Sequence, residues 1–250
     1  MIWIVGGTSD TTKLLDLLKM KIDFSKLIVS VTTDYGEQLL NSYKVKIIKG
    51  KIEKEEIQNF IEKNQIDTIV DTSHPYAENI SKNILELINL EKINYMRYER
   101  AKSIVDNEYN FESVENLIDY INENMKNEVI LSTLGSKAIP ELSKIENNKV
   151  LLRILPTVES VKSAIEYNFL PKDIIAIQGP FSREFEEEML KFYKATVLLT
   201  KDSGQAGGVL EKVEVCKKLG IKCLIVSRPK IDYPNVFGDI EEILKKLRKK

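Results

Sequence analysis

The sequence predicts an α/β protein made of two Rossmann-like domains with mainly parallel sheets. Short apolar runs alternate with segments of helical periodicity along the whole chain, and this alternation is typical of βαβ units. Nearly every apolar run ends in a cluster of small polar residues. Ligands of parallel α/β sheets bind outside the carboxyl ends of the strands. We therefore expect functional residues from both halves of the chain, at the carboxyl edges of the sheets.

The first series of elements occupies residues 1–100, which we assign to an N-terminal Rossmann-like nucleotide-binding domain. Leucines at positions 14, 15, 17 and 18 form an apolar stripe at helical spacing and predict the first helix. The predicted strands are 2–5, 27–32, 45–48, 67–70 and 94–97, and the predicted helices are 9–20, 35–42, 53–63 and 76–90.

A second series occupies residues 101–250, which we assign to a C-terminal α/β domain. The junction falls in the stretch 98–112, where the periodicity is weak, and we allow for the chain crossing back into the first domain. The predicted strands are 128–132, 149–153, 173–177, 196–200 and 222–226, and the predicted helices are 113–124, 157–168, 183–193, 209–219 and 238–248.

The composition argues against several classes of protein. Lys and Arg number 37 against 38 Asp and Glu, a net charge of −1, whereas a general nucleic-acid binder has a basic excess. No apolar run approaches the roughly 20 residues of a membrane helix, and the N-terminus lacks the features of a signal peptide. Cys216 and Cys223 have neither metal-ligand nor disulfide spacing. We expect a cytoplasmic protein with no nucleic-acid or membrane partner, no protein-bound metal and two reduced core thiols.

A glycine-rich turn after the first strand is the first candidate site. Gly6, Gly7 and Thr8 precede a helix, where glycine permits close backbone approach and the helix N-terminus offers N–H groups to a phosphate. An ordinary βα turn is the alternative, because the full GxGxxG pattern is absent. Asp34 follows the second strand, where an acid accepts from a ribose 2′-hydroxyl and repels a 2′-phosphate; it could equally be a turn residue. These four residues are the predicted cofactor-binding set.

The chain contains a single histidine, His74, which follows the fourth strand. A lone histidine is more often structural than catalytic, but this one precedes a proline suited to the first helical position. Its imidazole could donate to a substrate carboxylate or supply a proton. We take His74 as a catalytic candidate, and its neighbours Thr72, Ser73 and Tyr76 as substrate-binding candidates.

Two arginines, Arg97 and Arg100, follow the fifth strand. Arginine suits bidentate binding of carboxylates, so both are substrate-binding candidates. Alternation along the strand places Arg97 and Glu99 on one side, and an ion pair between these two is the simpler interpretation.

Polar clusters also follow the strands of the second half. One turn carries two hydroxyls, an ammonium and a carboxylate, in Thr200-Lys201-Asp202-Ser203, although Lys201 and Asp202 could simply pair with each other. Lys201 is the second catalytic candidate, as a proton donor. A glycine pair before the next helix suggests a further anion cradle. The substrate-binding candidates of this half are Ser132, Gly135, Ser136, Gly179, Ser182, Thr200, Asp202, Ser203, Gly204, Gly207 and Gly208.

Taken together, these residues resemble the precorrin-6A reductase family of cobalamin biosynthesis. Each motif alone is weak, but the ordered series through the whole chain is specific. The motifs are Ile4-Val5-Gly6-Gly7-Thr8, Asp71-Thr72-Ser73-His74-Pro75-Tyr76-Ala77, Arg97-Tyr98-Glu99-Arg100, Ser132-Thr133-Leu134-Gly135-Ser136, Gln178-Gly179-Pro180-Phe181-Ser182, Thr200-Lys201-Asp202-Ser203-Gly204, Gly207-Gly208, Lys212 and Val226-Ser227-Arg228-Pro229.

The resemblance implies an enzyme that transfers hydride from NADH or NADPH to a polycarboxylate tetrapyrrole. The reaction reduces one C=C bond of precorrin-6A, or of its cobalt-containing counterpart, and the substrate lies in a cleft between the two domains. Asp34 favours NADH, and we expect the cobalt-containing, anaerobic form of the substrate. The accompanying proton could come from His74, Lys201, Tyr76 or a water molecule.

Two other functions stay open at this point. One is a different NAD-dependent oxidoreductase, and the other is a non-catalytic, two-lobed ligand-binding protein. The glycine-rich first turn counts against the second, and so does the missing signal peptide. Cofactor binding discriminates between them, because a binding module should ignore NADH.

Overall fold

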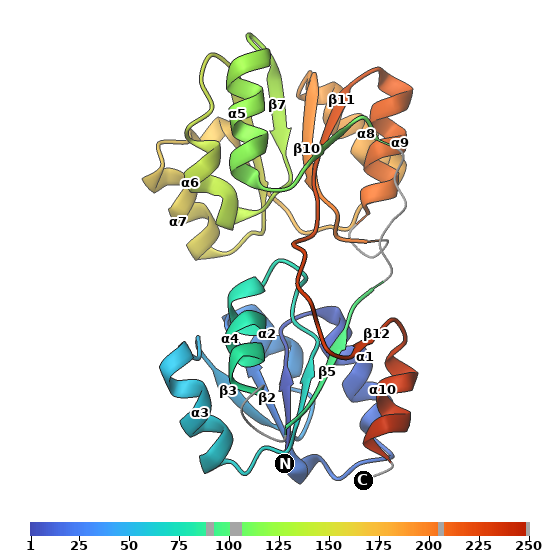
Figure 1. Ribbon diagram of the computed structural model, residues 1–250. Helices are drawn as coiled ribbons and strands as arrows, with labels where there is room; N and C mark the ends of the chain where they lie inside the picture. The colour runs from blue at the N-terminus through green and yellow to red at the C-terminus, as the bar shows by residue number, and fades with distance from the viewer. Residues whose placement is uncertain (89–92, 101–106, 205–207, 249–250) are drawn as a thin grey trace. The chain divides into compact units, whose positions relative to one another are not determined.

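The computed structural model describes residues 1–88, 93–100, 107–204 and 208–248. The chain divides into two compact units, Met1–Ala101 with Lys230–Lys250, and Lys102–Pro229 (Figure 1). The segment from Lys230 onward thus belongs to the first unit, so the second unit is shorter than the predicted range 101–250. This return of the chain is the crossing back that the sequence analysis allowed for.

The first unit is built on a parallel six-stranded sheet with the order β12-β5-β4-β1-β2-β3. Its strands are β1 (Ile2–Val5), β2 (Leu27–Val31), β3 (Lys46–Lys49), β4 (Thr68–Asp71), β5 (Asn94–Tyr98) and β12 (Val236–Phe237). Its helices are α1 (Ser9–Leu18), α2 (Asp34–Leu40), α3 (Lys54–Lys63), α4 (Glu78–Ile88) and α10 (Ile240–Leu247), with a short 3-10 turn at Phe24–Lys26.

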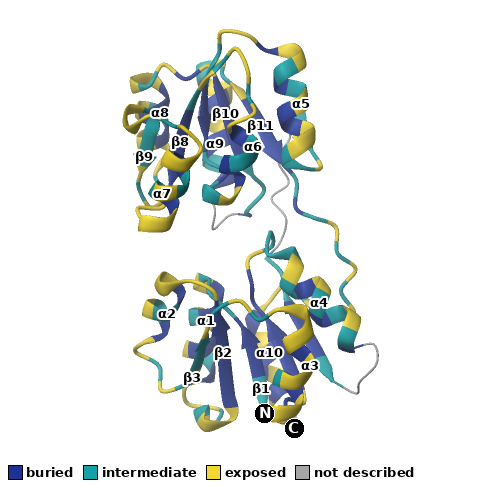
Figure 2. Cartoon of the chain, turned by 90° about the vertical axis from the view of Figure 1, so that its left-hand side faces the viewer, coloured by how far each residue is buried: buried dark blue, intermediate teal, exposed yellow. Residues whose placement is uncertain are grey.

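Alternation of side chains along the strands gives this sheet two apolar faces. Ile4 of β1 packs with Leu14 of α1 and Ile243 of α10 on one face. Trp3, its neighbour in the strand, packs with Ile57 of α3 on the other, where α4 also contributes. Figure 2 shows the buried strands between helices whose outer faces are exposed. The sheet is therefore covered on both faces, and only its edges are left for ligands.

The second unit repeats this plan, with the strand order β6-β11-β10-β7-β8-β9 and every pair parallel. Helices α8 and α9 bury Leu190 and Val213 against one face. The strands are β6 (Tyr109–Phe111), β7 (Val129–Ser132), β8 (Lys149–Ile154), β9 (Ile174–Ala176), β10 (Val197–Lys201) and β11 (Lys222–Val226). The helices are α5 (Val114–Asn124), α6 (Ile139–Leu142), α7 (Val158–Glu166), α8 (Arg183–Phe192) and α9 (Val209–Leu219), with 3-10 turns at Ser136–Ala138 and Pro171–Asp173.

The predicted fold class, α/β with two mainly parallel sheets, is confirmed. The sequence analysis missed the edge strands β6 and β12 and the short helix α6. Among the described residues, no helix is long and apolar enough to cross a membrane.

Candidate functional site

Each sheet has one point where the strand order reverses, and predicted motifs lie at both. In the first unit the reversal falls between β1 and β4, since β2 and β3 lie on one side of this pair and β5 on the other. In the second unit it falls between β7 and β10. Ligands of open α/β sheets bind in the crevice at such a switch point. The loops after these four strands carry Gly6–Thr8, Thr72–Tyr76, Thr133–Ser136 and Asp202–Gly204.

The glycine turn after β1 has the geometry of a phosphate-binding turn. A Cβ at Gly6 would lie 2.8 Å from Cγ2 of Thr11, so no side chain fits there. Gly7 has φ +104°, and a Cβ on it would meet nothing within 4 Å, so this face of the turn is open. The turn leads into the N-terminus of α1, which favours an anion. The open face of the turn thus lies at a helix N-terminus, where backbone N–H groups can stabilise an anion.

Thr8 forms hydrogen bonds that hold this turn in place. Its hydroxyl accepts from the Asp10 amide (3.2 Å) as the N-cap of α1, and it donates to the carbonyl of Thr72 (3.0 Å). Thr72 in turn donates its hydroxyl to the carbonyl of Val5 (3.0 Å). These bonds tie the loop after β4 to the glycine turn after β1, so the two predicted motifs form one edge of the site.

Arg97 differs from its prediction, because it is fully buried and pairs with Asp71 rather than Glu99. Its Nη1 donates to Oδ1 of Asp71 at 2.8 Å and to the hydroxyl of Ser73 at 3.0 Å. The ring of Tyr233, on the returning C-terminal segment, covers the guanidinium at 5.1 Å. Arg97 therefore holds the loop after β4 from beneath and offers no surface to a substrate.

Asp71 accepts a full set of hydrogen bonds around that ion pair. They come from the amide of Ser73 (2.9 Å) and the hydroxyls of Ser81 (2.6 Å) and Tyr95 (2.7 Å). Burial alone would raise the pKa of Asp71, but the Arg97 charge and these hydrogen bonds outweigh it and lower the pKa. The carboxylate therefore stays ionised inside the unit. Thr72 and Ser73, predicted as substrate-binding, are themselves buried in this network.

His74 projects from the loop that this network holds, and its side chain is exposed. The amide of Tyr76 donates to its Nδ1 at 3.3 Å, and the two rings lie 5.6 Å apart. Because Nδ1 accepts, a neutral His74 carries its proton on Nε2. The loop therefore holds the imidazole of His74 beside the switch point.

Arg100 lies at the first turn of α1. Its Nε donates to Oδ2 of Asp10 at 2.6 Å, and its Nη2 lies 3.4 Å from the hydroxyl of Ser9. Sequence analysis placed Arg100 with the substrate, whereas the structure places it beside the turn predicted to hold the cofactor.

Asp34 begins α2, just beyond the end of β2. The structure pairs it with Lys49, the last residue of β3, which also contacts Glu37 at 3.0 Å. The helix packs tightly on the glycine turn, since a Cβ at Gly36 would lie 3.5 Å from Cα of Gly7. Asp34 therefore stands near the turn where the second-strand acid of a dinucleotide site is expected. The sequence analysis missed Lys49, which ends a strand like the other candidates.

Lys201, the last residue of β10, lies in a basic environment. Burial and repulsion from Lys137 lower the pKa of Lys201 to about 8. Lys137 lies in the 3-10 turn after β7 and was also missed by the sequence analysis. The repulsion shows that the charges of Lys137 and Lys201 act on one another at this edge of the second sheet.

Asp202 makes contacts that hold its own loop in place. Its backbone carbonyl accepts from Nε of Arg228 at 2.9 Å, and its carboxylate lies 3.7 Å from the same atom. Its Oδ1 also accepts from the amide of Gly204 (3.3 Å), which has φ +73°. Arg228 is buried, so it acts as the internal support of the loop that follows Lys201 and carries Ser203.

The remaining candidates of the second unit fall into buried and exposed groups. Ser132 and Thr200 are buried at the strand ends. Gly135 and Ser136 stand at the partly exposed turn beside Lys137, and Ser182 caps α8 by accepting from the amide of Phe185 (3.4 Å). A Cβ at Gly208 would lie 3.9 Å from Cβ of Pro180, so the turn containing Gly179 reaches the start of α9. Gly207 lies outside the described residues.

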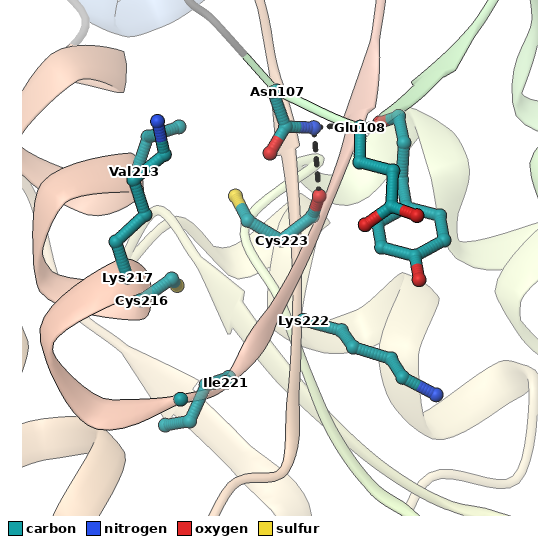
Figure 3. Close-up of a pocket in the computed structure, with 10 residues that line it drawn as sticks. Asn107, Glu108, Val213, Cys216, Lys217, Ile221, Lys222 and Cys223 are labelled. Carbon is teal, nitrogen blue, oxygen red and sulfur yellow. Dashed lines mark hydrogen bonds between the residues drawn. The ribbon is translucent and has the colours of Figure 1, made fainter.

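A small pocket in the second unit lies away from these loops. It has a volume of about 240 Å³ and is lined by Cys216, Cys223 and Lys222, among others (Figure 3). Lys222 begins β11, so the pocket is at the amino end of the sheet. A hydrogen bond with Cys223 and burial raise the pKa of Cys216, which makes its thiol unreactive. Within the described part of the chain, no cluster of three or more His, Cys, Asp or Glu side chains could hold a metal ion.

Comparison with known proteins gives one consistent family. Residues 1–248 match the family model described as precorrin-6x reductase CbiJ/CobK. The cobalt-precorrin-6A reductase of Priestia megaterium is 35% identical over 250 residues, covering 98% of this chain and 96% of the relative. That of Methanocaldococcus jannaschii is 36% identical over 244 residues, covering 97% and 96%. The precorrin-6A reductase of a Sinorhizobium species is 22% identical over 251 residues, covering 98% and 92%.

A solved structure shares the architecture. The chain described as CobK precorrin-6A reductase superimposes with a TM-score of 0.81 at 16% identity, covering 99% of this chain and 96% of that one. At this identity the likeness supports the fold alone.

Proposed function

The chain belongs to the precorrin-6x reductase CbiJ/CobK family, and from this premise we propose that it reduces cobalt-precorrin-6A with NADH. Its class, an oxidoreductase of cobalamin biosynthesis, follows from the family. The proposed reaction converts one C=C bond of the macrocycle to its dihydro form. The observation that carries the proposal is that the predicted loops meet at the switch point of each sheet.

We assign the cofactor to the first unit. Gly7 leaves one face of the turn open for a pyrophosphate at the start of α1, and the ion pair of Arg100 with Asp10 lies at the same turn. Asp34 stands where it can accept from the adenosine ribose. When bound, the reduced nicotinamide supplies the hydride, which is chemistry that no side chain can provide.

We assign recognition of substrate carboxylates chiefly to the second unit. A precorrin carries many carboxylates around a flat ring, and it needs dispersed donors more than one large basic patch. The exposed turn at Gly135 and Ser136, with Lys137 and Lys201 beside it, offers such donors. This distribution explains how a protein with a net charge of −1 can bind a polyanion.

Two side chains are our candidates for holding the proton that completes the reduction. The pKa of Lys201, lowered to about 8 by burial and by Lys137, keeps it protonated at neutral pH yet makes it a better acid than an ordinary lysine. His74 presents a protonated Nε2 when neutral. The catalytic roles of Lys201 and His74 are proposals that mutation must test.

The choice of the cobalt-containing substrate rests on the relatives. Proteins named cobalt-precorrin-6A reductase are 26% to 36% identical to this chain, whereas a protein named precorrin-6A reductase is 22% identical. The choice of NADH rests on Asp34, because a carboxylate at this place repels a 2′-phosphate. The cytoplasmic location expected from the sequence stays a prediction.

An anaerobic assay of the purified protein tests this proposal. Cobalt-precorrin-6A and the metal-free macrocycle are each incubated with NADH or NADPH, and nucleotide oxidation and macrocycle mass are followed together. We expect stoichiometric loss of NADH with a gain of two hydrogens in the cobalt macrocycle. Turnover of the metal-free macrocycle alone would overturn the cobalt assignment, and no turnover of either by folded protein would overturn the reductase.

A further inference from the structure

The carboxylate of Asp34 belongs to a small charged cluster, in which one lysine contacts two carboxylates. Nζ of Lys49 contacts Oδ1 of Asp34 and lies 3.0 Å from Oε2 of Glu37. Lys49 is the last residue of β3 and lies opposite Val31 in the register of β2, so its position is set by the sheet. With one cation and two anions, the cluster of Lys49, Asp34 and Glu37 carries a net charge of −1.

This cluster adjoins the turn to which we assign the cofactor. Asp34 and Gly36 share a helical turn, and a Cβ at Gly36 would be in van der Waals contact with Cα of Gly7, at 3.5 Å. The ribose of a dinucleotide lies beside the acid that follows the second strand. A dinucleotide bound in this way would have its 2′ position near Asp34 and its partner Lys49.

The neighbouring cation is engaged elsewhere. Lys51 pairs with Glu53 at 2.9 Å, on the segment that leads into α3. Lys49 is therefore the cation of this cluster that can meet a 2′-phosphate. The side chains of Lys49, Asp34 and Glu37 are 45%, 65% and 39% exposed. All three reach solvent, which allows the lysine to exchange partners.

We propose that Lys49 is a specificity-determining residue that limits how strongly the site, negative because of Asp34 and Glu37, prefers NADH over NADPH. Held by Asp34 and Glu37, it leaves the cluster negative and suited to a ribose hydroxyl. It also limits the repulsion of a 2′-phosphate, so the wild-type site accepts NADPH more weakly than NADH rather than excluding it. This inference rests on the proposed function, since it needs the cofactor in the first unit.

Direct binding measurements test the role of Lys49 without the macrocycle. Dissociation constants of NADH and NADPH are measured by fluorescence titration, and those of 5′-AMP and 2′,5′-ADP by calorimetry. In Lys49→Gln, we expect NADPH and 2′,5′-ADP to bind about five- to tenfold more weakly, the scale of a partly screened charge contact. NADH and 5′-AMP should change by less than about twofold, because their ribose carries no phosphate.

The converse variant releases the lysine. In Asp34→Asn with Glu37→Gln, the cluster becomes positive, and we expect 2′,5′-ADP to bind at least about tenfold more tightly, with NADPH preferred over NADH. Lys51→Gln is the matched control, because it removes the same charge from a lysine paired with a different carboxylate. It should leave the ratio of the two dissociation constants within about twofold of wild type.

The possible results distinguish the role of Lys49 from the assignment of the cofactor to the first unit. If the wild-type protein binds both nucleotides and Lys49→Gln leaves their ratio unchanged, the inference about Lys49 is wrong and the cofactor assignment stands. If folded wild-type protein binds neither nucleotide, the cofactor assignment itself fails and the inference falls with it. A shift in Lys51→Gln as large as in Lys49→Gln would show a general charge effect and would also overturn the specific role.

Discussion

Replacing Arg97 by Met should destabilise the first unit strongly. The substitution keeps an unbranched side chain of similar length but leaves the Asp71 carboxylate without its cation. Both side chains are fully buried, and Nη1 of Arg97 lies 2.8 Å from Oδ1 of Asp71. Removing one partner of a buried ion pair costs about 3–5 kcal/mol, because the other charge stays desolvated.

The structure places the expected cost toward the lower end of that range. Asp71 would keep its hydrogen bonds from the Ser73 amide and from the hydroxyls of Ser81 and Tyr95. The bond from Arg97 to the Ser73 hydroxyl would be lost, which adds about 1 kcal/mol. We therefore expect Arg97→Met to lower the free energy of unfolding by about 3–4 kcal/mol at neutral pH.

Urea unfolding followed by tryptophan fluorescence measures this cost. The chain has a single tryptophan, Trp3, which is buried in the first unit and donates to the hydroxyl of Ser30 at 2.8 Å. Its signal therefore reports the unit that contains the substitution. The double variant Arg97→Met with Asp71→Asn should cost less than the sum of the two singles, by about 1–3 kcal/mol, since neither charge is then left alone.

The dependence on pH has a definite sign. The Arg97 charge and the hydrogen bonds hold the pKa of Asp71 below its ordinary value of 3.8 despite burial, so its contribution to stability is present above that value and is lost as the pH falls through the folded-state pKa. In Arg97→Met burial dominates and the carboxyl takes up a proton at higher pH, so the cost of the substitution should shrink as the pH is lowered toward about 4.

A small effect would refute this account of the network. Lys82→Met, which removes the exposed ion pair with Glu78 (2.8 Å), is the matched control and should cost less than about 0.5 kcal/mol. If Arg97→Met costs no more than this control, or if the double variant is simply additive, the Arg97 charge does not stabilise the buried carboxylate.

Three further outcomes follow from the site and the core. If Lys201 delivers the proton, reductase activity should fall as the pH rises through about 8, and Lys201→Met should lose at least about tenfold in kcat while nucleotide binding is unchanged; an unaltered pH profile in this variant would assign the proton to another group. Gly6→Ala should weaken NADH binding at least about tenfold, because the new Cβ would lie 2.8 Å from Thr11, whereas Gly238→Ala, with nothing within 4 Å, should leave binding unchanged. The buried Cys216 and Cys223 should resist a thiol reagent in folded protein and react on unfolding, and rapid labelling in native buffer would contradict their burial.

The parts of the fold that sequence reasoning predicted are those determined by local chemistry. Helices α1, α7 and α8 begin after Thr8, Thr157 and Ser182, each of which caps its helix with its own hydroxyl. The central strands are apolar runs that must be buried on both faces of a parallel sheet. Each of these signals involves only residues that are close together in the sequence, so it can be recognised without the tertiary structure.

The edge strands were missed for the opposite reason. β12 is only two residues long and β6 three, so neither shows periodicity. They are strands because β12 pairs with β5 and β6 pairs with β11, far away in the sequence. The return of the chain to the first unit depends on the same pairing of distant segments.

The candidate site divides in the same way. The glycine turn, the loop of His74 and the loop of Lys201 were found from sequence because each directly follows an apolar strand. The role of Arg97 was not, since its partner Asp71 lies 26 residues away on the neighbouring strand. Lys49 and Lys137 carry no local motif, and they matter only because of the charged groups that the sheets bring beside them.

The sequence by itself therefore determined the fold class, the positions of the strand-end loops and the family to which they point. Periodicity, capping and glycine turns depend on residues close together in the chain. They can therefore be recognised without knowing which distant residues they contact. Only the tertiary structure decided which polar side chains stay exposed at the strand ends and which are buried in hydrogen-bond networks. The reason is that the partners in these hydrogen bonds and ion pairs come from other strands. Arg97, Thr72 and Ser73 were drawn into the interior by Asp71 and its neighbours, while Lys49 was brought to Asp34 by the pairing of β2 with β3.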